Sequence, residues 1–251
     1  MTEPSKAQPS KIKTKDRIIV ALDVETADEA RAIVKEIGDA AGAFKIGLQL
    51  FTSAGPEFVR ALTDAGTRVF LDLKFHDIPT TVAKASVEAA RLGVWMFNVH
   101  ASGGREMMSA AASAVKEFCE HDGRQVPIML GVTLLTSSNT TTLAEGGIET
   151  SVGDYVVNMA RLSAVAGLSG VVVSSHEAAL VKRAVELSNF CVVTPGIRPI
   201  GGTNDDQKRV MTPAEAVFAG SDYLVIGRPI TSAADRKRAV TDIVEEIDRP
   251  K

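Results

Sequence analysis

Three charged side chains lie close together in the sequence and could together carry out proton transfer. They are Asp72, Lys74 and Asp77, within the segment VFLDLKFHDIPTTV that spans residues 69–82. Side chains alternate along a strand, so Asp72 and Lys74 should point to the same side, together with Phe70. An ammonium ion about 4 Å from a carboxylate gains roughly 4 kcal/mol at an effective dielectric constant near 20. We therefore expect the lysine to stay protonated and to act as a proton donor rather than as an amine nucleophile.

The same residue types also fit simpler roles. Asp72 and Lys74 fit a structural ion pair, because networks of this kind also gather charges. Asp77 fits the N-cap of a helix that begins near Pro79. The spacing alone leaves both interpretations open.

The elements that must position these residues alternate between strand-like and helix-like segments. Most of the apolar runs are continuous, as in strands covered on both faces of a parallel sheet. The runs are residues 18–22, 43–47, 69–73, 95–99, 128–132, 171–173, 191–193 and 223–226. Apolar residues at helical spacing occupy residues 27–38, 82–93, 106–118, 154–166, 177–187, 213–220 and 236–247. This order predicts a single α/β domain, a (β/α)8 TIM barrel over residues 16–251, with a doubly wound open sheet as the alternative.

A barrel of this type carries its functional residues at the C-terminal ends of the strands. Asp23 follows the first predicted strand, Lys45 lies in the second, and Asp72 and Lys74 come at the end of the third. All four should face one small mouth, so we expect a site there.

A phosphate site is predicted on the other side of the same mouth. A long glycine-containing connection, residues 195–208, follows the seventh predicted strand, and Gly227 and Arg228 follow the eighth. Barrels commonly hold a phosphate in this region, where backbone N–H groups and an arginine suit a dianion. A solvated arginine beside a turn is the simpler interpretation of Arg228.

The composition of the chain limits the kinds of function that it could have. Apolar residues make up 45% of the 251 residues, charged residues make up 24%, and the net charge is −3. These values are ordinary for a globular enzyme and argue against nucleic-acid or membrane partners. The polar, lysine-bearing residues 1–15 are expected to be a disordered tail rather than a signal peptide, which makes the cytoplasm the default location.

The central motif also resembles that of a known family. The run D-x-K-x-x-D-I-P-x-T is similar to the signature of the orotidine 5'-phosphate decarboxylases, and its members are Asp72, Lys74, Asp77, Ile78, Pro79 and Thr81. Over residues 17–230 the motifs VALD, FKIG, NVHASGG, LTS, VTPGIRP and VIGRPI follow in the family's order. Thr80 stands where the family often has asparagine, and Gln49 stands where an acid is common. Neither departure touches the charged residues.

The resemblance implies a cofactor-free, metal-free decarboxylation of orotidine 5'-phosphate to UMP and CO2, the last step of de novo pyrimidine nucleotide synthesis. It implies a catalytic network in which Lys74 is the proton donor, and the network consists of Lys45, Asp72, Lys74 and Asp77. Asp23 and Lys45 are then expected to hold the ribose hydroxyls and Thr136 to contact the pyrimidine.

The resemblance also implies a phosphate cluster and a shared active site. The phosphate cluster consists of Arg198, Gln207, Gly227 and Arg228, with the loop that carries Gln207 as a lid. Asp77 and Thr81 are expected to reach into the partner's site in a homodimer.

Three other functions remain as alternatives. A metal-dependent sugar-phosphate decarboxylase, such as 3-keto-gulonate 6-phosphate decarboxylase, has a similar D-x-K-x-x-D run and uses its metal to stabilise an enediolate. A Schiff-base aldolase needs a neutral lysine, which two flanking acids disfavour. A non-catalytic UMP-binding scaffold would have no need for the charged network.

Overall fold

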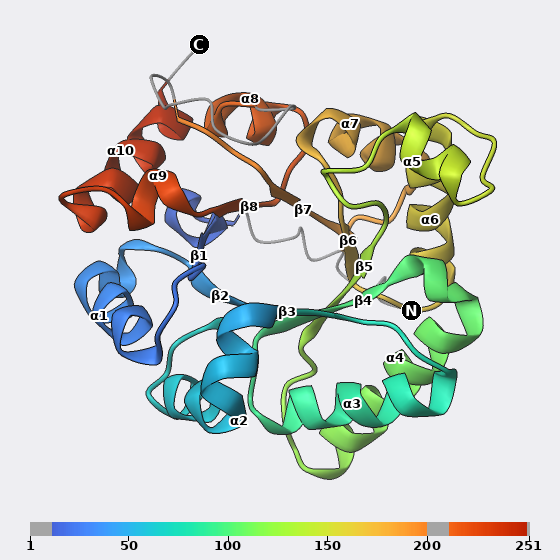
Figure 1. Cartoon of the computed structure of the whole chain (residues 1–251), viewed down its shortest axis with the longest axis horizontal. Coiled ribbons are helices and arrows are strands. Elements are labelled where there is room, and N and C mark those ends of the chain that lie inside the picture. Colours follow the sequence, from blue (N-terminus) through green and yellow to red (C-terminus); the bar gives the residue numbers. More distant parts are fainter. Residues whose placement is uncertain (1–11, 200–210, 250–251) are drawn as a thin grey trace, which may run out of the picture.

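The computed structural model describes residues 12–199 and 211–249. Within these ranges eight parallel strands close into a barrel in sequence order, and β8 pairs with β1 to complete the ring. Helices surround the barrel on the outside (Figure 1). The TIM barrel predicted from the sequence is therefore confirmed.

The strands are β1 Ile18–Ala21, β2 Ala43–Gly47, β3 Val69–Phe75, β4 Met96–His100, β5 Ile128–Val132, β6 Gly170–Val172, β7 Cys191–Pro195 and β8 Tyr223–Ile226. The α-helices are α1 Ala27–Ile37, α2 Leu48–Asp64, α3 Pro79–Arg91, α4 Gly104–His121, α5 Thr140–Glu145, α6 Val152–Val165, α7 Ser175–Ala184, α8 Pro213–Phe218, α9 Arg228–Thr231 and α10 Arg236–Asp248. Short 3-10 helices are η1 Thr14–Arg17, η2 Gly38–Ala40 and η3 Ala101–Gly103.

Each predicted strand overlaps an observed one, and the helices differ more from the prediction. α2 was not predicted, because Gly55 interrupts its pattern with a φ of 72° and Pro56 follows directly. Capping side chains set where helices begin: Thr26 accepts from the N–H of Glu29 at the start of α1. The expected boundary between tail and barrel falls inside η1, and residues 1–11 lie outside the described residues.

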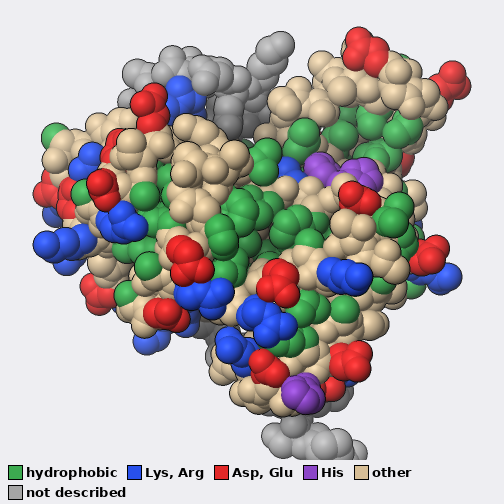
Figure 2. All heavy atoms as spheres, turned by 60° about the horizontal axis from the view of Figure 1, so that its bottom comes forward, with side chains coloured by type: hydrophobic (Ala, Val, Ile, Leu, Met, Phe, Trp, Pro, Cys, Tyr) green, Lys and Arg blue, Asp and Glu red, His purple; other side chains and the backbone are tan. Residues whose placement is uncertain are grey.

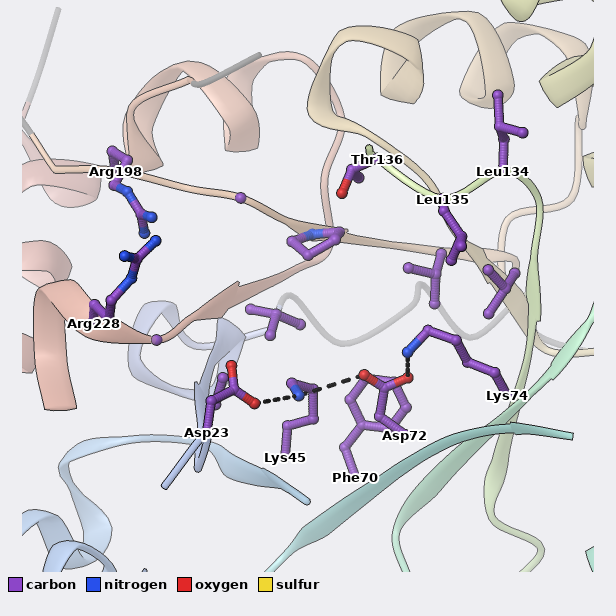
Figure 3. A pocket seen from close by; sticks show the side chains of 17 residues that line it. Asp23, Lys45, Phe70, Asp72, Lys74, Leu134, Leu135, Thr136, Arg198 and Arg228 are labelled. Atoms are coloured by element: carbon purple, nitrogen blue, oxygen red, sulfur yellow. Dashed lines mark hydrogen bonds and ion pairs between the residues drawn. The ribbon is translucent and has the colours of Figure 1, made fainter. Parts of the chain in front are cut away.

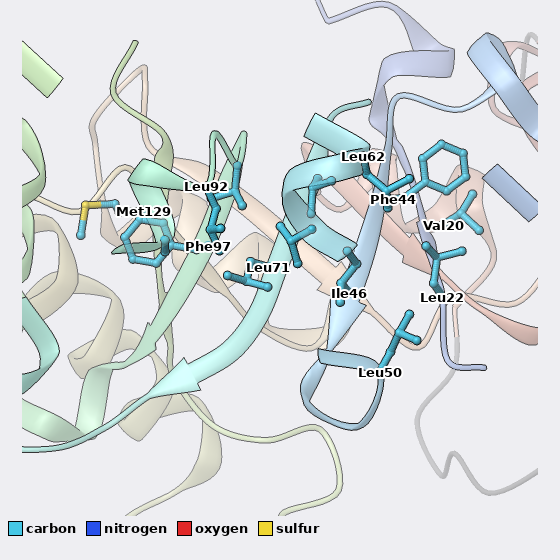
Figure 4. Packing of buried hydrophobic residues seen from close by; sticks show 14 of the residues in the cluster. Val20, Leu22, Phe44, Ile46, Leu50, Leu62, Leu71, Leu92, Phe97 and Met129 are labelled. Atoms are coloured by element: carbon cyan, nitrogen blue, oxygen red, sulfur yellow. The ribbon is translucent and has the colours of Figure 1, made fainter. Parts of the chain in front are cut away.

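The core has two layers because strand side chains alternate in direction. Inside the barrel, one layer stacks side chains from several strands: Ile19, Ala21, Ala43, Phe70, Met96, Leu130, Val193 and Val225. The alternate residues point outward against the helices, as Ile46, Leu71 and Phe97 do (Figure 4). The inner layer fills the barrel and forms a rigid floor beneath the C-terminal strand ends.

The surface carries both signs of charge. On the face drawn in Figure 2, Lys and Arg side chains lie among Asp and Glu side chains, with hydrophobic side chains between them. Within the described residues, no helix is both long and apolar enough to cross a membrane. The cytoplasmic location stays a prediction.

Candidate active site

Four charged side chains alternate in sign across the C-terminal ends of β1, β2 and β3. The Lys45 Nζ lies 3.0 Å from Asp23 Oδ1 and 3.4 Å from Asp72 Oδ2. The other oxygen of Asp72, Oδ1, accepts a hydrogen bond of 2.7 Å from Lys74 Nζ. The row Asp23, Lys45, Asp72, Lys74 is drawn in Figure 3 with its contacts dashed. The structure thus brings together the four charges that the strand-end argument placed at one mouth.

Burial strengthens the attraction between the opposite charges of this row, because little water screens them. The side chains of Lys45 and Asp72 are only 10% and 13% exposed. Burial disfavours the ammonium of Lys45, but the carboxylates of Asp72 and Asp23 outweigh that effect and raise its pKa. Burial likewise disfavours the carboxylate of Asp72, but the two lysines outweigh it and lower its pKa. Both groups are therefore charged at neutral pH.

The backbone at Lys74 is unusual. Its φ is +52°, the one positive φ of a non-glycine residue in the described part of the chain. A left-handed backbone costs a side-chain-bearing residue about 1–2 kcal/mol. Leu71 pairs with Phe97 and Phe75 pairs with Val99, so β3 has extra residues between these two pairs. Lys74 lies within this bulge, and its side chain contacts Asp72 and lines the cavity.

A cavity of about 350 Å³ lies above the charged row. Its floor is apolar and includes Phe70, Val172 and Val225. Arg198, just after β7, and Arg228, at the start of α9, both line it, and their guanidinium groups point toward each other in Figure 3. Two convergent guanidinium groups suit an anion such as a phosphate. The cavity thus combines a cationic end, an apolar floor and a row of alternating charges.

Two other predicted residues line the same cavity. Thr136 lies in the connection after β5, beside Leu134 and Leu135, and Gly227 is the residue before α9. A Cβ added at Gly227 would lie 3.6 Å from the Cβ of Ala21 and 3.7 Å from Asp23 Oδ2. Both are ordinary van der Waals distances, so a Cβ would fit at this point of the rim.

Two of the predicted site residues that the structure describes do not line this cavity. Asp77 and Thr81 are exposed and are not among the described residues that line it. Asp77 Oδ1 accepts from the N–H of Ile78 at 2.6 Å, and Ile78, not Asp77, is the N-cap of α3. Gln207 lies outside the described residues. The roles of all three stay predictions.

One buried polar residue of the site was not predicted. Asn98, on the inner face of β4, is 1% exposed and hydrogen-bonds both Asp72 and the backbone of Lys74. The period-two alternation of β4 places Asn98 and His100 on the same face as Met96, and this was the signal available in the sequence.

His100 extends the polar face of β4. Its ring lies 5.4 Å from that of His76, centroid to centroid. Burial, and then the nearby His76 and Lys74, lower the pKa of His100, so its imidazole is neutral at neutral pH. Among the residues described, no three His, Cys, Asp or Glu side chains gather as a set of metal ligands.

Fold and site together define an α/β-barrel enzyme whose charged site lies at the C-terminal mouth, beside a pair of arginines. Residues 16–243 match the family described as Orotidine 5'-phosphate decarboxylase / HUMPS family. The chain belongs to that family, and the resemblance seen in its motifs is confirmed.

Relatives agree with this assignment. The orotidine 5'-phosphate decarboxylase of Syntrophotalea carbinolica is 50% identical over 94% of this chain and 96% of its own length. That of Pelobacter propionicus is 52% identical over 92% and 95%. The crystal structure of orotidine 5'-phosphate decarboxylase from Lactobacillus acidophilus is similar with a TM-score of 0.81 at 34% identity, covering 92% of this chain and 99% of that one. The prediction that the chain is an enzyme of this family is confirmed.

The lowered pKa of Asp72 predicts a pH-dependent contribution to stability. Replacing Asp72 by Asn should lower the free energy of unfolding by about 2 kcal/mol at pH 7, because two lysines lose their shared counter-ion. A carboxyl with a lowered folded pKa stabilises fully above its unfolded pKa of about 3.9, and loses that contribution as the pH falls through the folded value. The difference between wild type and Asp72→Asn should therefore shrink below about pH 4.

Urea unfolding of both proteins from pH 7 downward measures this difference. Asp64→Asn, at the exposed end of α2, is the matched control and should show little difference at any pH. A deficit for Asp72→Asn that is the same at every pH would contradict the ionised state assigned to Asp72.

Proposed function

We propose that this chain decarboxylates orotidine 5'-phosphate to UMP and CO2 without a cofactor. The observation that carries the proposal is the Lys74 ammonium, held 2.7 Å from Asp72 at a cavity whose other end has two arginines. The relatives that share half of the sequence bear the name of this activity.

The substrate would lie across the cavity with its phosphate at the arginine end. Arg198 and Arg228 would bind the phosphate, together with the backbone at Gly227 and the side chain of Gln207. Asp23 and Lys45 would hold the ribose hydroxyls, and Thr136 would hydrogen-bond the pyrimidine. These contacts are far from carbon 6, so their binding energy can orient the ring and drive closure of the site.

The chemical step breaks the bond between carbon 6 and the carboxylate. The electron pair stays on carbon 6 as CO2 leaves, and no ring carbonyl is placed to delocalise it. The fixed Lys74 ammonium stabilises that charge and then gives a proton to carbon 6, which yields UMP. Asp72 keeps Lys74 in place and repels the substrate carboxylate in the ground state. The neutral Lys74 regains its proton from solvent after the product leaves.

We further propose that the active site is completed by a second copy of the chain. Asp77 and Thr81 are exposed at the mouth in a single chain, and large apolar side chains are exposed at neighbouring strand ends, with Leu48 and Ile78 both 64% exposed. Burying such side chains between two copies is favourable. A homodimer would place Asp77 and Thr81 of one copy at the site of the other.

The reaction is tested by the ultraviolet absorbance of orotidine 5'-phosphate mixed with the purified chain. We expect loss of the orotate band with UMP as the product, at the same rate with and without EDTA. Loss that EDTA abolishes would instead favour the metal-dependent sugar-phosphate type of site. UMP binding without turnover would favour a binding scaffold.

The role of Lys74 is tested by Lys74→Ala. Turnover should fall by at least about a thousandfold, because both charge stabilisation and proton donation are lost. The dissociation constant for UMP should change only a few-fold, since the phosphate and ribose contacts remain. Lys84→Ala, an exposed lysine of α3, is the matched control and should keep wild-type turnover. Near-normal turnover by Lys74→Ala would overturn the proton-donor assignment.

The shared site is tested by mixing two inactive variants, Lys74→Ala and Asp77→Ala. In a symmetric dimer whose sites each use one residue from each copy, random exchange leaves roughly a quarter of the sites intact. Activity should therefore reappear on mixing after the subunits exchange. If both variants are inactive alone and their mixture stays inactive after proven exchange, Asp77 acts within its own chain.

A further inference from the structure

A buried amide joins the two charged residues of β3 to β4. Asn98 Nδ2 donates to Asp72 Oδ1 at 2.7 Å, the same oxygen that accepts from Lys74 Nζ. Asn98 Oδ1 accepts from the backbone N–H of Lys74 at 2.8 Å. The Asn98 side chain therefore makes a hydrogen bond through each of its two polar atoms, as a donor to the Asp72 carboxylate and as an acceptor from the Lys74 backbone. These two bonds also fix which end of the amide is the nitrogen.

The bond to the Lys74 backbone replaces a sheet contact. β3 carries extra residues between its pairs with Phe97 and Val99 of β4, so the regular ladder is interrupted there. The N–H of Lys74, in its left-handed conformation, meets the side chain of Asn98 instead of a strand carbonyl. Asn98 is itself fixed, since it is 1% exposed and lies on a strand paired on both sides.

We propose that Asn98 is a positioning residue of this active site, which holds the Lys74 backbone in its bulge and orients the carboxylate that Lys74 contacts. This inference rests on the proposed function, because Lys74 is the proton donor there. Asn98 lies beneath the reacting groups and acts through Lys74 and Asp72 without contact to the substrate. Its loss should therefore lower kcat and leave binding of the phosphate and ribose nearly unchanged.

The first test is Asn98→Ala. At saturating orotidine 5'-phosphate, kcat should fall by roughly 10–100-fold, as for other residues that orient a reacting group. The dissociation constant for UMP should stay within about threefold, because the residues around UMP remain in place. Asn158→Ala, an exposed asparagine of α6, is the matched control and should leave both values unchanged.

The second test is Asn98→Asp, which separates positioning from a general loss of packing. A protonated carboxyl at this position offers an O–H to Asp72 and a carbonyl to the Lys74 N–H, so it reproduces both bonds of the amide. Once ionised, it has no donor and faces the Asp72 carboxylate. The ratio of variant to wild-type kcat should therefore fall as the pH rises, about tenfold per pH unit once the introduced carboxyl is ionised.

Other charged groups surround this position and are common to both proteins. They are Lys45 on β2, Asp72 and Lys74 on β3, His76 after β3 and His100 on β4, while the facing residues of β5 are the apolar Leu130 and Val132. Taking the ratio to wild type removes their own titration.

The outcomes distinguish the two proposals. Wild-type turnover together with an Asn98→Ala kcat within twofold of wild type would overturn the inference alone. A ratio for Asn98→Asp that does not change with pH would do the same, because packing loss does not depend on protonation. A folded wild-type chain without turnover would overturn the proposed function, and this inference with it.

Discussion

The active site depends on one carboxylate that is shared between two ammonium groups. Asp72 has one oxygen toward Lys45 and the other toward Lys74, at a position that is nearly closed to water. Removing Asp72 would take from Lys74 the carboxylate that it contacts and would leave Lys45 with the contact to Asp23, so both lysines depend on this one acid. The strand order of the barrel supplies this arrangement, because β2 and β3 are neighbours whose C-terminal ends meet at the mouth.

The rest of the structure holds that carboxylate in place. The apolar layer below it, with Phe70 and Val225, excludes water from the barrel interior and gives the charges a low-dielectric floor. Lys74 lies in the bulge of β3 with a left-handed backbone, and Asn98 accepts a hydrogen bond from its backbone N–H. The two arginines line the other end of the cavity. An anion bound there would therefore lie apart from the lysines and acids that carry out proton transfer.

Much of the site could be predicted because its residues lie at strand ends, and apolar runs mark strands well. Lys45 lies within such a run, and Asp23, Asp72 and Lys74 lie at or just after the end of one, so the barrel topology alone brings the four to one mouth. α2 was missed because Gly55 and Pro56 break the helical spacing that the prediction relied on. Asn98 was not predicted as a site residue, because the period of two along β4 gives the direction of its side chain but not its partners.

The sequence by itself determined the number and order of the strands, the mouth at which the charges meet and the family to which the chain belongs. These follow from local patterns, namely apolar runs, alternation and short motifs. The tertiary structure decided which oxygen of Asp72 each lysine contacts, that Asp77 does not line the cavity of its own chain, and that Asn98 connects β3 to β4. The contacts between β3 and β4 depend on the register shift between these strands and on the positive φ of Lys74. Both are set by packing between strands that are distant in sequence, so local sequence patterns do not reveal them.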